Sequence, residues 1–184
     1  MTSAADGPAV VIGVGNVLLR DDGVGVRAAE ALRSAARRDP TALPEATRIV
    51  DGGTLGVDLL GLVEGARSLV LLDAVDLDQP AGTVSVLRGD AILAAGGRWG
   101  RCVPGGVGEL LSVARLMGWL PDPVALVGIQ IDDAGFGVGL SERVAAALPR
   151  AVDAVCEELR ALDGLADAAA PRTSGPGHAE GATA

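Results

Sequence analysis

Short apolar segments alternate with amphipathic segments along most of the chain. Four stretches have helical periodicity, namely 22–38, 54–65, 107–118 and 142–163. Five apolar runs have the length of strands: 9–15, 47–53, 68–75, 82–89 and 123–130. This alternation predicts a doubly wound α/β sheet of mostly parallel strands. The run 82–89 alternates between apolar and polar residues, so we expect it to be a half-exposed edge strand that runs antiparallel.

The predicted elements form a single domain. The chain has 184 residues, which is long enough to bury one core, and no repeat or linker divides it. Thr54 and Ser141 are predicted to cap the helices that follow them. Residues after Leu165 are rich in Ala, Gly and Pro and have no apolar period. We therefore expect a domain at 1–165 and a disordered tail at 166–184.

The residue types that the chain lacks exclude several kinds of active site. All 15 basic residues are arginine and there is no tyrosine, so a P-loop lysine, a Schiff-base lysine and a Tyr-Lys pair are unavailable. The only histidine, His178, lies in the predicted tail, which disfavours a Ser-His-Asp or Cys-His site. Any chemistry therefore depends on Asp, Glu, Cys, Ser, Thr, backbone amides or an imported metal ion.

Charge and cysteine content indicate a cytoplasmic protein. The formal net charge of -9 argues against nucleic acid or an anionic membrane as a partner. No apolar run reaches about 18 residues, so we expect no transmembrane helix, and the first residues lack the features of a signal peptide. Cys102 and Cys156 are far apart and lack metal-site spacing, which is typical of free thiols in the cytosol.

Acidic residues follow three of the predicted strands. Asp21 and Asp22 come just after the first, Asp51 closes the second, and Asp73 closes the third. If the strand order is 2-1-3, these carboxylates meet at the sheet edge where open α/β sheets bind ligands. Carboxylates that converge repel one another, so we expect them to hold a metal ion or an arginine-bearing peptide. Structural alternatives remain, because each could instead cap a helix or bind turn amides.

The opening glycines also allow a weaker alternative, a dinucleotide-binding oxidoreductase. Gly13 and Gly15 match the first two positions of a G-x-G-x-x-G loop, but the third position is Leu18. We expect Leu18 to obstruct a close approach of helix to strand, and the following aspartates oppose a pyrophosphate. Asp51 does suit the acid that binds a ribose.

The same motifs resemble those of the hydrogenase maturation endopeptidases, from about Val10 to Leu159. "GVGNVLLRDDGVGVR" is similar to the family's opening motif and "DGGTLGVDLL" to its second. "LLDAV" with "PAGTVSVLR" resembles the third, and "PDPVALVGIQ" with "GVGLSERV" the closing segments. The resemblance implies a three-layer α/β/α sandwich. It also implies a metal-dependent, aspartate-type endopeptidase of the cytoplasm that removes the C-terminal extension of a nickel–iron hydrogenase large-subunit precursor.

The resemblance implies a set of site residues as well. The family's metal is held by an acid after the opening motif, an Asp that ends the central strand, and a His before the next helix. The first two positions match Asp22 and Asp73, which would be both metal ligands and catalytic residues. Nickel already inserted in the precursor would serve as the recognition element, with zinc or cadmium able to bind in its place. The second motif would bind substrate through Asp51, Gly52, Gly53 and Thr54.

The third ligand position departs from the family pattern. A gapless count places it at Val103, which cannot coordinate a metal ion. The neighbouring Cys102 is an alternative donor, since thiolates bind nickel and zinc well. Cysteines of the precursor could also complete the metal's coordination. The missing ligand keeps open a second function, that of a non-catalytic binding protein or chaperone for the metallated precursor.

Overall fold

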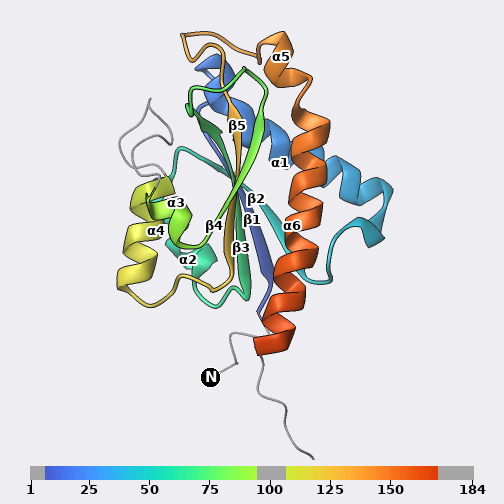
Figure 1. The fold of residues 1–184 in the computed structure, drawn as a ribbon, viewed down its shortest axis with the longest axis vertical. Helices are drawn as coiled ribbons and strands as arrows, with labels where there is room; N and C mark the ends of the chain where they lie inside the picture. The colour runs from blue at the N-terminus through green and yellow to red at the C-terminus, as the bar shows by residue number, and fades with distance from the viewer. Residues whose placement is uncertain (1–6, 95–106, 170–184) are drawn as a thin grey trace, which may run out of the picture.

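The computed structural model describes residues 7–94 and 107–169, which form a sheet covered by helices on both faces (Figure 1). The sheet has five strands in the order β2-β1-β3-β5-β4. The predicted α/β fold is confirmed, and the first three strands have the order 2-1-3 on which the expected meeting of the carboxylates depended. The strands are β1 (Ala9–Val14), β2 (Thr47–Gly53), β3 (Ser68–Val75), β4 (Val84–Arg88) and β5 (Val124–Gln130).

The sheet is parallel except at one edge. Strand β1 pairs in parallel with β2 and β3, and β3 pairs in parallel with β5. Strand β4 pairs with β5 in the antiparallel direction, which confirms the prediction for this segment. Strands β1, β3 and β5 are buried throughout, whereas β4 is only half-buried and exposed at its end. The apolar runs of the inner strands follow from burial on both faces.

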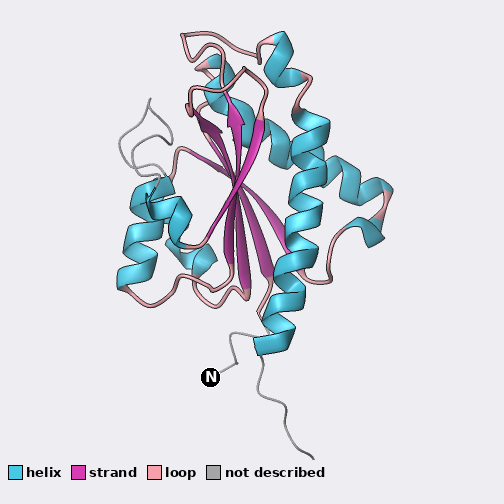
Figure 2. Cartoon of the chain, in the orientation of Figure 1, coloured by secondary structure: helices cyan, strands magenta, loops and turns pink. Residues whose placement is uncertain are grey.

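Two helical layers enclose this sheet (Figures 1 and 2). On one face α1 (Val24–Arg38) and α6 (Leu148–Ala169) pack against alternate strand residues such as Val11, Leu72 and Val127. The other face of the sheet carries the intervening strand residues, such as Ile12, Leu71 and Leu126, in a second core cluster. It is covered by α2 (Leu60–Val63), α3 (Asp90–Ala94) and α4 (Val107–Leu116), while α5 (Glu142–Ala145) precedes α6.

Glycines set the distance between α1 and the sheet. A Cβ atom at Gly25 would lie 2.3 Å from the carbonyl oxygens of both Leu72 and Val14. A Cβ atom at Gly13 would lie 2.3 Å from the carbonyl oxygen of Gly25. The first turn of α1 therefore rests directly on the backbones of β1 and β3, which no larger residue at these positions allows.

Several predicted helix boundaries are wrong. The segment predicted as one helix at 54–65 is a 3-10 turn, η4 (Gly56–Leu59), followed by α2. Thr54 does not cap it, since the N-cap position is Leu55. The Leu55 amide donates to the carbonyl oxygen of Gly52 (3.1 Å), so the chain is still in a turn where the helix was expected to begin.

The last predicted helix, 142–163, is divided into α5 and α6. Ser141 occupies the N-cap position of α5, but its side chain makes no capping hydrogen bond. Helix α6 continues to Ala169, so residues 166–169 are helical where the tail was expected to begin. Residues 170–184, including His178, lie outside the described residues.

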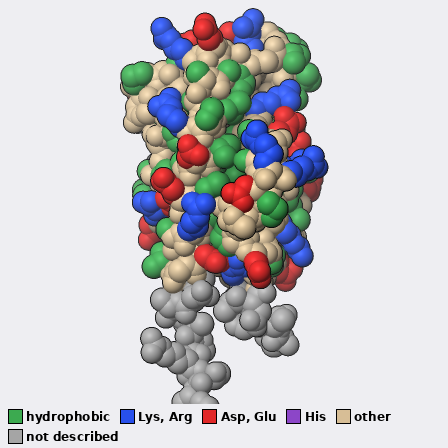
Figure 3. Space-filling model, turned by 90° about the vertical axis from the view of Figure 1, so that its right-hand side faces the viewer, with side chains coloured by type: hydrophobic (Ala, Val, Ile, Leu, Met, Phe, Trp, Pro, Cys, Tyr) green, Lys and Arg blue, Asp and Glu red, His purple; other side chains and the backbone are tan. Residues whose placement is uncertain are grey.

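The surface mixes charges of both signs. On the face drawn in Figure 3, arginines and acidic side chains are interspersed with apolar ones. In the part of the chain that the structure describes, no helix combines the length and apolar character needed to cross a bilayer.

Candidate functional site

Asp22 and Asp73 are buried carboxylates beside the carboxyl ends of β1 and β3. Asp73 lies within β3 and is 4% exposed, while Asp22 lies in the 3-10 turn η2 (Arg20–Gly23) and is 3% exposed. The Asp73 carboxylate accepts a hydrogen bond from the Ala74 amide (2.8 Å), and the Asp22 carboxylate accepts one from the Asn16 amide (2.8 Å). Within the described residues no ion pair reaches either carboxylate.

Burial and the nearby charge of Asp22 destabilise the ionised form of Asp73. Burial raises the pKa of Asp73 well above its ordinary value; the Ala74 amide lowers it, and the negative charge of Asp22 raises it further. The two carboxylates are therefore close enough to interact electrostatically. A buried pair of like charges is costly unless a proton or a cation is bound between them.

The third predicted metal position is not tested. Val103 and Cys102 lie outside the described residues. Within residues 7–94 and 107–169, no three His, Cys, Asp or Glu side chains form a group that could hold a metal ion. Asp22 and Asp73 thus offer a two-carboxylate set, which suits a metal ion that arrives with other ligands already attached.

Asp51 does not join the buried pair. It lies on β2 opposite Gly13 of β1, while Leu72 of β3 pairs with Gly13 from the other side. Its side chain is exposed and accepts a hydrogen bond from the Gly53 amide (3.0 Å), the turn-forming alternative considered above. The motif still adjoins the opening loop, because the Gly15 amide donates to the Gly53 carbonyl oxygen (2.9 Å).

The remaining residues of that motif differ in exposure. Gly52 is buried, and a Cβ atom there would lie 2.7 Å from the Ile12 side chain. Gly53 has a positive φ of 47°, and Thr54 is exposed. Among the four residues predicted to bind substrate, Asp51 and Thr54 are therefore the two with side chains that solvent or a partner can reach.

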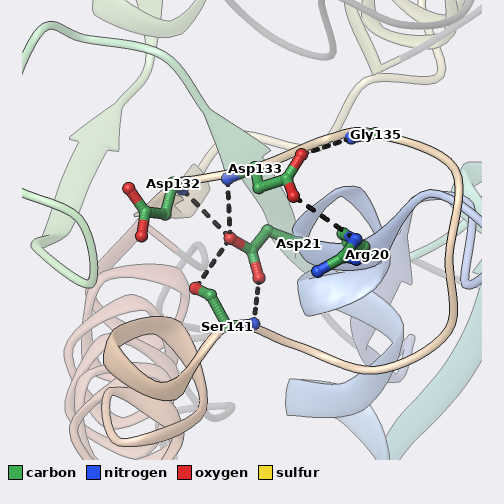
Figure 4. Close-up of polar contacts among 6 residues, drawn as sticks. All are labelled: Arg20, Asp21, Asp132, Asp133, Gly135 and Ser141. Carbon is green, nitrogen blue, oxygen red and sulfur yellow. Dashed lines mark hydrogen bonds and ion pairs between the residues drawn. The ribbon is translucent and has the colours of Figure 1, made fainter.

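Asp21, the neighbour of Asp22, is completely buried and holds a distant loop (Figure 4). One carboxylate oxygen accepts hydrogen bonds from the amides of Asp132 and Asp133, both at 3.0 Å, and from the Ser141 hydroxyl at 2.8 Å. The other oxygen accepts from the Ser141 amide at 2.6 Å. Asp21 thereby fixes both ends of the segment 131–141, hereafter the 131–141 loop.

Electrostatics agree with this anchoring role. Burial raises the pKa of Asp21, but hydrogen bonds from the Asp133 amide, the Ser141 amide and hydroxyl, and the Asp132 amide outweigh burial and hold the pKa below its ordinary value. A carboxylate with several donors is stable as the anion. Asp21 was predicted either to cap a helix or to be one of the converging carboxylates. Its anchoring role was missed, because its partners are more than 100 residues away along the chain.

We expect Asp21→Asn to lower the free energy of unfolding by about 1–3 kcal/mol at pH 7. The asparagine amide group would direct N–H donors at a site that now receives four donors, which leaves buried backbone amides without acceptors. Urea denaturation of the full chain measures the difference. Asp133→Asn is the matched control, because Asp133 is half exposed in its ion pair with Arg20 and should cost less than about 1 kcal/mol. Equal stabilities for the two variants would contradict the anchoring role.

Leu18 does not obstruct the helix, contrary to the prediction. Its side chain is 54% exposed, because η2 separates the glycine loop from α1. The close approach of helix to strand occurs later, at Gly25. The glycines of the opening motif therefore serve helix packing. The buried anions Asp21 and Asp22 lie directly before the start of α1, where a dinucleotide loop would bind its pyrophosphate.

Comparison with known proteins gives a consistent result. Residues 26–158 match the family model described as "Hydrogenase maturation protease". The chain is 35% identical over 154 residues to the hydrogenase expression/formation protein HupD of Rhodobacter capsulatus, covering 83% of this chain and 71% of that protein. It is 34% identical over 152 residues to the hydrogenase 2 maturation protease of Escherichia coli strain K12, covering 82% of this chain and 90% of that protein.

Solved structures agree in fold. The hydrogenase maturating endopeptidase HybD from Escherichia coli superposes with a TM-score of 0.73 at 32% sequence identity, covering 84% of this chain and 93% of that chain. The hydrogenase 2 maturation peptidase from Thaumarchaeota archaeon SCGC_AB-539-E09 has a TM-score of 0.60 at 32% identity, covering 83% and 97%.

Proposed function

Because the chain belongs to the hydrogenase maturation protease family, we propose that it is an endopeptidase that removes the C-terminal extension of a nickel–iron hydrogenase large-subunit precursor. The observation that carries this proposal is the buried pair Asp22 and Asp73, which repel each other and have no cation of their own among the described residues. Such a pair is suited to a positively charged element of the substrate.

Nickel is part of the substrate in this mechanism. The metallated precursor presents its nickel ion, with the precursor's own ligands, to Asp22 and Asp73. Zinc or cadmium would bind the same carboxylates in place of nickel. Binding of a cation relieves the repulsion between the carboxylates and favours their ionised forms. The protein would therefore bind the metallated precursor in preference to the empty one, since an empty precursor brings no cation to offset the repulsion between Asp22 and Asp73.

Hydrolysis then needs an oriented water molecule and a positioned peptide bond. A carboxylate of the pair accepts a proton from water as the water oxygen attacks the scissile carbonyl carbon, and it returns that proton to the leaving amine nitrogen as the C–N bond breaks. A metal ion held by Asp22 and Asp73 would supply positive charge beside the carbonyl oxygen. The exposed Asp51 and Thr54, with Gly52 and Gly53 between them, bind the precursor chain next to the carboxylates. We place this reaction in the cytoplasm. The net charge of -9 supports a partner that is neither nucleic acid nor an anionic membrane.

Mass spectrometry of the precursor tests the proposal directly. The full chain is incubated with nickel-loaded large-subunit precursor and, as a control, with the same precursor free of nickel. We expect the loss of the extension only from the nickel-loaded form. Tight binding of nickel-loaded precursor without any change in its mass would replace the protease by the non-catalytic chaperone.

A further inference from the structure

The 131–141 loop exposes apolar side chains beside the candidate site. Phe136 is 88% exposed and Val138 is 76% exposed. Phe136 is the single phenylalanine of a chain with only 2% aromatic residues, and it contributes nothing to the core. Leu18, which is 54% exposed, lies next to them, because the Gly137 amide donates to the Leu18 carbonyl oxygen (2.9 Å). We refer to Leu18, Phe136 and Val138 as the apolar rim.

Backbone hydrogen bonds between residues 18–20 and Gly137 fix the position of the apolar rim. The Arg20 amide donates to the Gly137 carbonyl oxygen (3.0 Å), and Leu19 and Gly137 form an isolated parallel bridge. Gly137 has a φ of 157°, a backbone conformation that side-chain-bearing residues rarely adopt, and the Arg20 side chain lies over it, with Nε 2.9 Å from where a Cβ atom would be. Together with the Asp21 bonds at both ends of the loop, these contacts preorganise its apolar side chains, which lowers the entropy lost on binding.

The apolar rim is connected by backbone hydrogen bonds to the segments that carry Asp22 and Asp73. The Asp22 amide donates to the carbonyl oxygen of Leu19 (3.0 Å), the residue that follows Leu18. At the start of the loop, the Ile131 amide donates to the carbonyl oxygen of Val75 (3.1 Å), two residues beyond Asp73. Leu18 and the start of the loop therefore lie at the end of the sheet where the two carboxylates lie, so a polypeptide bound at that end can extend onto the apolar rim.

We propose that the apolar rim is a docking surface for the large-subunit precursor, with Phe136 as its central contact. The proposal rests on the proposed function, since it takes its partner from it. An exposed aromatic side chain on a preorganised loop has the character of a binding hot spot. The charged neighbours Arg20 and Asp133 are paired with each other (3.3 Å). Asp132 is exposed at the start of the loop, so the contact offered around Phe136 is mainly apolar. A second copy of this chain is disfavoured as the occupant, because a net charge of -9 on each copy opposes self-association.

Steady-state cleavage of nickel-loaded precursor by Phe136→Ala tests the proposal. We expect KM to rise at least about tenfold, equal to about 1.4 kcal/mol of binding free energy, with kcat unchanged within about twofold, because the rim binds substrate without touching the reacting atoms. Leu116→Ala is the matched control, since Leu116 is 87% exposed at the end of α4, and it should leave both constants unchanged. Melting temperatures should match wild type for both variants, because both side chains are exposed.

Two results would overturn the proposal that the apolar rim is a docking surface. One is an unchanged KM for Phe136→Ala and for the double variant Phe136→Ala, Val138→Ala. Another is a wild-type dimer in sedimentation that Phe136→Ala dissociates, which would make a second copy the occupant.

A binding titration with labelled nickel-loaded precursor separates this proposal from the proposed function. If the wild-type protein binds the precursor without cutting it, the protease function fails. At least tenfold weaker binding by Phe136→Ala would then still support the docking surface. Wild type that neither binds nor cuts overturns both.

Discussion

Asp73→Asn is expected to abolish removal of the extension while the fold remains intact. The substitution keeps the shape of the side chain and an oxygen that accepts from the Ala74 amide, but it removes half of the negative charge offered to the metal. We expect cleavage of nickel-loaded precursor to fall at least about a hundredfold, roughly 2.7 kcal/mol in activation free energy. Mass spectrometry over time measures the rate. Asp90→Asn, an exposed aspartate paired with Arg115, serves as the control and should cut at the wild-type rate.

The stability of Asp73→Asn separates chemistry from folding. Because the pKa of Asp73 is raised in the folded protein, the unfolded chain loses this proton first as the pH rises. Protonated Asp73 thus contributes fully to the free energy of unfolding below pH 3.8, its ordinary pKa. The contribution is lost as the pH rises from there through the raised pKa of the folded state. Asparagine carries no such penalty. In metal-free buffer at pH 7, the variant should melt at or above the wild-type temperature, and the difference should shrink toward pH 3.8. A much lower melting temperature at pH 7 would assign Asp73 a structural role instead.

The second large effect is expected at Gly25. A methyl group at this position would lie 2.3 Å from two backbone carbonyl oxygens on neighbouring strands, those of Val14 and Leu72. Neither oxygen can move alone, because each belongs to a buried strand of the sheet. Gly25→Ala should therefore lower the free energy of unfolding by at least about 3 kcal/mol, at the upper end of overpacking costs. Urea denaturation measures the loss.

Gly61→Ala provides a control at an equivalent position. Gly61 is the second residue of α2, as Gly25 is of α1, and no atom lies within 4 Å of a Cβ atom placed there. The gain in helix propensity, about 0.5–1 kcal/mol, should make this variant equal to or more stable than wild type. If Gly25→Ala proved as stable as Gly61→Ala, the close packing of α1 on the sheet would be wrong.

The order of the elements could be predicted from sequence because its signals are local. Apolar runs predicted all five strands, and the alternation in 82–89 predicted the antiparallel edge strand that β4 forms. Helix boundaries were less predictable. The break between α5 and α6 and the turn before η4 depend on hydrogen bonds within loops, which leave no periodic pattern in the chain.

The candidate site was predictable only in part. Asp22 and Asp73 were identified from strand ends and from the family motifs, and both are buried and interact. Among the described residues Asp51 does not form a metal-holding group with them, and its exposed carboxylate accepts a hydrogen bond from a turn amide. The role of Asp21 was missed because every hydrogen bond that its carboxylate accepts comes from beyond β5. The predictions for Val103 and Cys102 stay untested.

The order of strands in the sheet also bears on the order of folding during synthesis. Strands β1, β2 and β3 are neighbours in the sheet and follow one another in the chain, so they can pair once residue Val75 has left the ribosome. Asp22 and Asp73 belong to this early part. The 131–141 loop is made only after β5, whose pairing with β3 closes a long loop and is correspondingly slow. The nascent chain would therefore contain its two carboxylates before it contains the apolar rim that is proposed to bind the precursor.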